Sequence, residues 1–124
     1  MTKKSVLVVG HHFSGKSKTI NQYLKPLLNI NTHAHIFHVN GWRGFVLSQS
    51  SEESEKDVHQ LIEKYSHFDL FVLACRPESD ERSNLKAVQN ALEKTSFKVS
   101  VVAIHTPEEA PDKAREIFEL LSSK

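Results

Sequence analysis

The stretch of sequence that decides the fold is VLVVGHHFSGKSKTINQYLKPLL, which covers residues 6–28. Its first four residues are apolar, as in a strand that is buried on both faces of a parallel sheet. The turn that follows contains Gly10 and Gly15, and after this turn apolar side chains such as Ile20 and Leu24 recur at helical spacing. A buried strand that runs through a glycine turn into a covering helix predicts an α/β fold.

Four further segments have the composition of strands. Residues 45–47, 70–74 and 99–104 are apolar runs, and the mixed run 35–39 is typical of a half-exposed edge strand. The short connection at 40–43 cannot hold the crossover that a parallel pair needs, so the second and third strands should form an antiparallel hairpin. We therefore expect one domain with a five-stranded, mainly parallel sheet.

Three more segments carry apolar side chains at helical spacing and would cover this sheet. Capping-box spacing predicts that one helix begins near Ser50 and Glu53, and that the last begins near Thr106 and Glu109. The three apolar stripes are Val58, Leu61, Ile62 and Tyr65; Leu85, Val88, Ala91 and Leu92; and Ala114, Ile117, Phe118 and Leu121.

The composition limits the classes of function. A formal net charge of +1 gives no strong field for nucleic acid or anionic membranes, so neither is an expected partner. The sequence shows no signal peptide or membrane-spanning run, and the single cysteine, Cys75, is expected to be a buried thiol in a reducing compartment. These features favour a cytoplasmic protein, and the eight histidines are expected at the surface rather than in a metal site.

Residues 10–17 read GHHFSGKS and match the pattern G-x-x-x-x-G-K-S without a mismatch. Glycines at a tight turn let backbone N–H groups approach a polyanion. Lys16 is expected to reach the β- and γ-phosphates of a nucleoside triphosphate, and Ser17 to ligate the Mg²⁺ bound to them. The predicted phosphate-binding residues are Gly10, His11, His12, Phe13, Ser14, Gly15, Lys16, Ser17 and Lys18.

This motif and the order of elements resemble the P-loop NTPase superfamily. The antiparallel hairpin between the first two helices resembles the Ras-like GTPase branch of that superfamily. The resemblance implies a three-layer sandwich with strand order 2-3-1-4-5 and a site at the carboxyl ends of the strands.

The sequence departs from the Ras-like pattern at two places. The Walker B aspartate is absent after the third strand, and candidate substitutes are Glu52, Glu53, Glu55, Glu78 and Asp80. The guanine-reading motif is absent after the last strand, so ATP is the default nucleotide and GTP stays open. Gln49, in the expected loop after the third strand, is the candidate for orienting an attacking water.

Three functions remain open at this level: slow Mg²⁺-dependent hydrolysis of a triphosphate, a small-molecule or nucleotide kinase, and a non-catalytic nucleotide-binding subunit or switch. Arg76 and Arg82 follow the fourth strand, where arginines of small P-loop kinases stabilise the transferring phosphoryl group. Arg76 is the predicted nucleotide contact, although internal ion pairing within this loop is the alternative. Trp42 at the hairpin marks an expected protein-partner site, with packing onto its own domain as the alternative.

Overall fold

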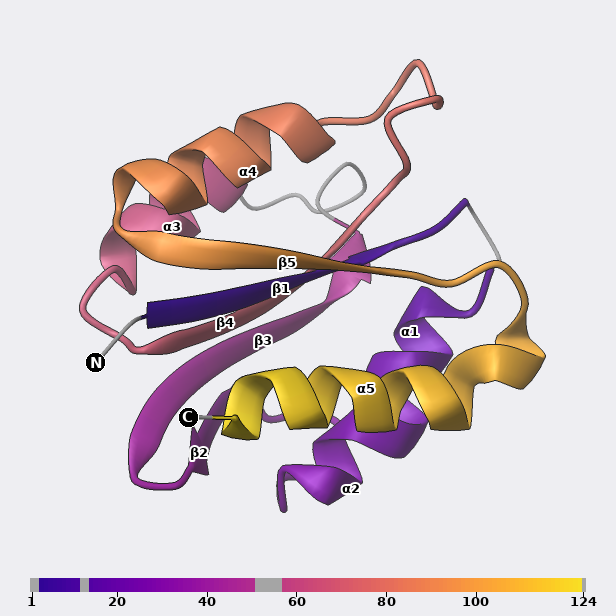
Figure 1. The fold of residues 1–124 in the computed structure, drawn as a ribbon, viewed down its shortest axis with the longest axis horizontal. Helices are drawn as coiled ribbons and strands as arrows, with labels where there is room; N and C mark the ends of the chain where they lie inside the picture. The colour runs from indigo at the N-terminus through magenta and orange to yellow at the C-terminus, as the bar shows by residue number, and fades with distance from the viewer. Residues whose placement is uncertain (1–2, 12–13, 51–56, 124) are drawn as a thin grey trace.

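The structure is a computed structural model that describes residues 3–11, 14–50 and 57–123. The strands are β1 (Lys3–Val9), β2 (Ile36–Val39), β3 (Trp42–Ser50), β4 (Leu70–Cys75) and β5 (Phe97–Ala103). The helices are α1 (Lys16–Lys18), η1 (Thr19–Leu24), α2 (Lys25–Leu27), α3 (Val58–Lys64), α4 (Leu85–Lys94), η2 (Pro107–Glu109) and α5 (Ala110–Ser122). This is the α/β class expected from the sequence, and Figure 1 shows helices on both faces of the sheet.

The strand order is β2-β3-β4-β1-β5, so the predicted order 2-3-1-4-5 is wrong. β2 and β3 form the expected antiparallel pair, and the other pairs are parallel. The difference is that β3 lies beside β4 rather than beside β1. Strands that follow one another in the chain usually lie side by side, and the crossover through α3 joins β3 to its direct neighbour.

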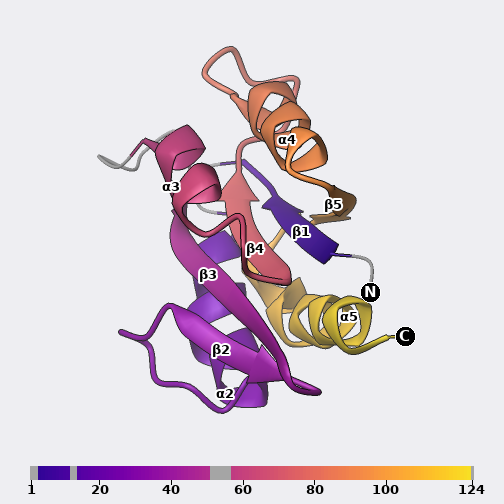
Figure 2. The same ribbon diagram turned by 90° about the vertical axis from the view of Figure 1, so that its left-hand side faces the viewer.

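The two faces of the sheet bury separate apolar clusters. On one face, Val6 and Val8 of β1 pack with Ile20 of η1 and Ile117 of α5. On the other face, alternate residues of the same strands pack with apolar side chains of α3 and α4. Figure 2 shows the same division, with α5 and α2 on one side of the sheet and α3 and α4 on the other.

The first helical segment runs without a break from α1 through η1 to α2, and its middle part is π-helical. The wider π-helical turns shift the register of the side chains that follow. As a result, Leu27, which the helical spacing places toward the core, is 42% exposed, whereas Lys25 is fully buried. The remaining apolar residues of that stripe, Ile20, Leu24 and Leu28, are buried as predicted.

β3 and α3 differ from the sequence-based boundaries. β3 extends to Ser50, and α3 is capped by Asp57, whose side chain accepts hydrogen bonds from the backbone N–H groups of His59 and Gln60. The predicted helix start at Ser50 is therefore wrong, because a cap nearer the apolar stripe satisfies the first N–H groups. Its partner in that prediction, Glu53, lies outside the described residues.

The hairpin turn consists of Asn40 and Gly41, which both have positive φ angles. This conformation matches the right-handed twist of the flanking strands. No helix in the described parts of the chain is both long and apolar enough to cross a membrane.

Candidate phosphate-binding site

The loop after β1 lies at the carboxyl ends of three neighbouring strands. The Gly10 N–H donates to the Cys75 carbonyl at the end of β4, at 3.2 Å. The Ile104 N–H, just after β5, donates to the Val9 carbonyl at 2.8 Å. Because the connections after β1 and β4 leave toward opposite faces of the sheet, this end is where open α/β sheets bind ligands.

Two glycines shape this loop for steric reasons. A Cβ on Gly10 would lie 2.6 Å from the Ile104 carbonyl oxygen and would also collide with the Ser14 hydroxyl. Gly15 has a φ of +103°, and a Cβ there would lie 2.8 Å from Cα of Pro107. The loop therefore folds back closely on itself and on the segment after β5, and side chains are excluded from both turns.

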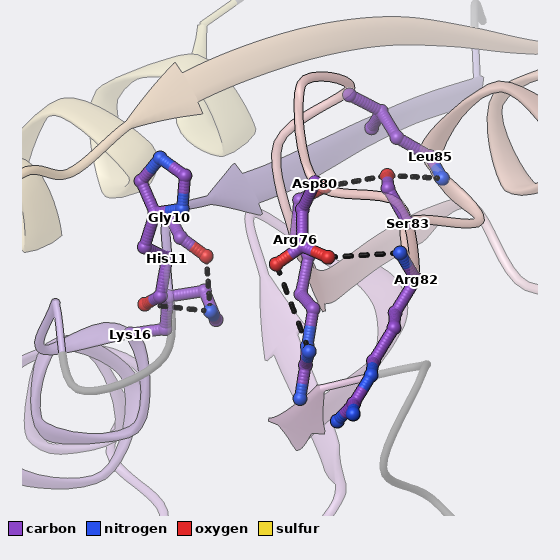
Figure 3. A network of polar contacts seen from close by, with 8 residues as sticks. All are labelled: Gly10, His11, Lys16, Arg76, Asp80, Arg82, Ser83 and Leu85. Carbon is purple, nitrogen blue, oxygen red and sulfur yellow. Dashed lines mark hydrogen bonds and ion pairs between the residues drawn. The ribbon is translucent and has the colours of Figure 1, made fainter.

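The side chain of Lys16 arches back over the loop. Its ammonium donates to the carbonyl oxygens of Gly10 and His11, the latter at 3.2 Å, and the residue is only 8% exposed (Figure 3). The geometry fixes a positive charge beside the loop backbone rather than in bulk water. A charge held in this way strengthens any electrostatic interaction with an anion that enters the loop.

The residues around Lys16 supply hydroxyl groups and a helix start. Ser14 is 6% exposed, and its hydroxyl has no hydrogen-bond partner in the described part of the chain. Ser17 is exposed, and its hydroxyl oxygen accepts from Nδ2 of Asn21 at 3.2 Å. The first helical turn closes through the Thr19 N–H, which donates to the Gly15 carbonyl at 2.8 Å.

A Mg²⁺ triphosphate would fit this donor set. Magnesium prefers oxygen ligands and bridges to phosphate oxygens, and the exposed hydroxyl of Ser17 is such a ligand. The Ser14 hydroxyl is a buried donor without a partner in the described part of the chain, and it lies beside Gly10. No cluster of three or more His, Cys, Asp or Glu residues suited to a metal occurs within residues 3–11, 14–50 and 57–123.

The loop after β4 is ordered by Asp80. Its carboxylate accepts from the Arg82 N–H at 2.8 Å and pairs with the Arg76 guanidinium at 3.6 Å (Figure 3). The Ser83 hydroxyl donates to the Arg76 carbonyl at 2.9 Å and accepts from the Leu85 N–H, which ties the loop to the start of α4. Arg76 is thus held one residue beyond the strand that borders Gly10, with its side chain 12% exposed.

The loop after β5 forms the opposite wall and is fixed by the predicted capping box. The Glu109 carboxylate accepts from the N–H groups of His105 at 2.8 Å and Thr106 at 2.9 Å, and the Thr106 side chain accepts in return. These N–H donors lower the pKa of Glu109 below its ordinary value. The N–H of Glu108 itself and the Thr106 hydroxyl likewise lower the pKa of Glu108, with a smaller effect from Lys18.

The other predicted site residues are spread more widely. Gln49 is exposed and lies on β3 rather than in a loop. It lies within an irregularity of the strand, because Val46 and Ser50 are four positions apart while their partners on β4, Val72 and Ala74, are two apart. Such bulges redirect side chains near the ends of strands.

The remaining candidates either lie outside the described residues or are placed elsewhere in the structure. His12 and Phe13, and the proposed Walker B substitutes Glu52, Glu53 and Glu55, lie outside the described residues. Glu78 is exposed and pairs with Lys86 at 2.8 Å, so it is engaged on the surface of the β4–α4 loop. Trp42 is 38% exposed at the end of the hairpin, away from the loop after β1.

One feature of the site was not predicted from the sequence: Pro107 and Ile104 back the two glycines, although they lie about 90 residues further along the chain. The i,i+4 ion pair between Arg76 and Asp80 is the internal ion pairing that is the sequence-based alternative for this loop. A scan against protein-family models, a search of curated proteins and a search of solved structures found no match to this chain.

Proposed function

We propose that the protein binds a Mg²⁺ nucleoside triphosphate in the loop at residues 10–17 and hydrolyses it slowly. The observation that carries the proposal is the Lys16 ammonium, which is held over its own loop by the Gly10 and His11 carbonyls. The motif, the preceding buried strand and the following helix support the same conclusion. ATP is the expected nucleotide because the sequence lacks the guanine-reading motif.

Several groups of the loop would contact the triphosphate and its Mg²⁺. Backbone N–H groups from Phe13 to Lys18 would donate to phosphate oxygens, and the helix start after Gly15 would favour their negative charge. Lys16 would leave its carbonyl partners in part and pair with the β- and γ-phosphates. Mg²⁺, when bound through Ser17, would supply neutralisation of the charge on those phosphates.

Arg76 would add a second positive charge from the β4 side of the site. Its position one residue after Cys75 places it next to the strand that leads into the loop. The ion pair with Asp80 keeps the guanidinium from swinging freely into solvent. In this arrangement Arg76 would contact the terminal phosphate, and Asp80 would position it.

The deciding experiment is calorimetric titration of the protein with ATP and with GTP, each with Mg²⁺, alongside two lysine variants. Lys16→Ala should weaken binding by at least about a hundredfold, because it removes charge-assisted hydrogen bonds. Lys18→Ala is the matched control, since it keeps the backbone N–H that is assigned to the phosphate and removes only an exposed side chain two residues further along the same helix. Its effect should be at most a few-fold.

The outcomes separate binding from chemistry. Binding of one nucleotide that Lys16→Ala abolishes and Lys18→Ala spares supports the site, and phosphate release can then be assayed. Equal weakening by the two variants would point to general charge attraction rather than a built phosphate site. If neither nucleotide binds, the proposed function is wrong.

A further inference from the structure

A groove lies on the α3 face of the β2–β3 hairpin, at the opposite edge of the sheet from β5. It has a volume of about 470 Å³. The lining comes from three separate stretches of the chain, namely Ala34, His35 and Ile36, then Phe45, and finally Leu61, Lys64 and Tyr65. None of these residues belongs to the candidate phosphate site.

The floor of the groove is a rigid stack of aromatic rings. Phe45 is 4% exposed, and its ring centroid lies 4.5 Å from that of Tyr65 and 5.8 Å from that of His35. Tyr65 packs further against Phe68 at 5.0 Å. A stack with few rotamers offers contact area at a low cost in conformational entropy.

An apolar side chain at the rim is left open to solvent. Ile36 of β2 is 45% exposed, although its cross-strand partner Phe45 is buried. α3 covers β3 on this face, but β2 extends beyond the helix (Figure 2). The groove therefore has an apolar floor and an uncovered apolar lip.

The charge in the groove lining is positive, although the Asp69 carboxylate lies beside Arg43 and accepts from its N–H at 3.3 Å. Lys64 is the one charged residue in the lining, where its ammonium lies 5.4 Å from the centroid of the Tyr65 ring. His38 and Arg43 form the next cross-strand pair on the same face of the hairpin as Ile36 and Phe45. No carboxylate lines the groove among the residues that the structure describes.

The groove adjoins the open edge of the sheet. β2 is the terminal strand of the order β2-β3-β4-β1-β5, so one side of its backbone faces no other strand of the sheet. An edge of this kind pairs with an extended peptide through main-chain hydrogen bonds, while alternate side chains of that peptide fill neighbouring pockets.

We propose that β2 and this groove form a docking site for an extended segment of a partner protein in which every second side chain faces the groove, and these groove-facing side chains are in turn apolar and acidic. The apolar side chains would enter the groove over Phe45 and Ile36. The acidic side chains would pair with Lys64 and Arg43, which gives the surface its preference for an anionic partner. The site works independently of the triphosphate loop.

The test is fluorescence anisotropy of the whole protein with a labelled eight-residue peptide of sequence Val-Thr-Glu-Thr-Val-Thr-Glu-Thr, which places valine and glutamate on one face of the strand and threonine on the other. The matched peptide replaces every glutamate by lysine. Ile36→Glu and Lys64→Glu are the test variants, and Val101→Glu and Lys98→Glu are their controls, because Val101 and Lys98 are exposed on β5 at the other edge. All four substitutions are at exposed positions, so each variant is expected to fold.

The glutamate peptide should bind at least about tenfold more tightly than the lysine peptide, and Ile36→Glu and Lys64→Glu should each weaken it about fivefold or more. The two β5 variants should bind as the unaltered protein does. Equal binding of both peptides, equal loss at the β5 edge, or no binding at millimolar protein would overturn the proposal. Sedimentation that reveals a dimer dispersed by Ile36→Glu would instead assign the groove to a second copy of this chain.

Discussion

The loop after β1 and the groove beside β2 are built in opposite ways. The loop is made from neighbouring residues, and backbone sterics at Gly10 and Gly15 fix its shape. The groove is made from side chains of three distant segments, and ring packing around Phe45 fixes its shape. A turn that depends on local backbone geometry can be identified from a sequence motif, whereas a surface that is assembled from distant segments can be identified only from the folded structure.

The largest expected effect tests whether backbone sterics control the loop. Gly10→Ala should destabilise the protein by about 3 kcal/mol, because the added Cβ meets the Ile104 carbonyl in a closely packed turn. It should also abolish triphosphate binding. Urea unfolding followed by circular dichroism measures the first effect, and titration with ATP measures the second.

Gly41→Ala is the control for this prediction. Gly41 has a φ of +82° but no atom within 4 Å of an added Cβ, so only the backbone conformation opposes the substitution. The cost should be about 1 kcal/mol, and nucleotide binding should not change. Equal costs at Gly10 and Gly41 would mean that the contact with Ile104 is relieved by a small movement of the loop.

The sequence predicted the fold class and the hairpin because both depend on local patterns. Apolar runs identified four strands, the mixed run at 35–39 identified β2, and the short connection at 40–43 identified the antiparallel pair. The strand order was wrong because β1, β3 and β4 are all apolar runs, and nothing in their composition selects one neighbour over another. The order was taken from a resemblance, whereas the structure keeps β3 and β4 adjacent.

Some features of the candidate site were likewise predicted from the sequence, and others were not. The motif marked the loop itself, and the spacing of Thr106 and Glu109 marked the capping box. The contact of Pro107 with Gly15 depends on tertiary packing, which the spacing of residues does not reveal. The charges of Arg76 and Asp80, in contrast, predict their i,i+4 pair as one of two alternatives for this loop. The π-helical turns that bury Lys25 also escaped, because helical periodicity assumes an α-helix throughout.

A second prediction tests the groove as a packed assembly. Phe45→Leu should cost about 1.5 kcal/mol through the loss of ring stacking and volume. It should weaken the glutamate peptide while leaving triphosphate binding intact. Phe97→Leu is the matched control, because Phe97 is buried on the same face and its ring packs edge-to-face against Phe71, away from the groove.

The Phe97→Leu variant should lose similar stability and keep its affinity for the peptide. Peptide binding that falls equally in both variants would show that the groove responds to the stability of the whole core. That result would weaken the contrast between the two regions, because peptide binding would then depend on the stability of the core and not on the shape of the groove.

A third prediction concerns Lys25, which links the two regions. This residue is fully buried on the helix that follows the loop, and its ammonium donates to the Thr32 carbonyl at 2.7 Å, just before the hairpin. Burial lowers the pKa of Lys25. Lys25→Met should therefore stabilise the protein by about 1 kcal/mol at pH 7.

The pH dependence identifies the cause of that gain. The unfolded chain binds the Lys25 proton more tightly than the folded protein does, so the stability of the unaltered protein rises with pH between the lowered pKa and the ordinary one. The advantage of Lys25→Met should shrink over the same interval, and Lys18→Met at an exposed position should show no such trend. Destabilisation by Lys25→Met at pH 7 would mean that the bond to Thr32 outweighs the cost of burial.

The smallest expected effect concerns Glu109, whose capping box holds Pro107 against Gly15. The pKa of Glu109 is lowered by the N–H groups of His105 and Thr106, so its ionised form stabilises the fold above the ordinary pKa, and this contribution is lost as the pH falls through the lowered value. Glu109→Gln should therefore be less stable than the unaltered protein above the ordinary pKa of a glutamate, and the two should be equally stable below the lowered pKa. Glu119→Gln, on the exposed side of α5, should show no such difference. A deficit in Glu109→Gln that does not change with pH would show that the geometry of the hydrogen bonds, rather than the carboxylate charge, keeps this wall of the loop in place.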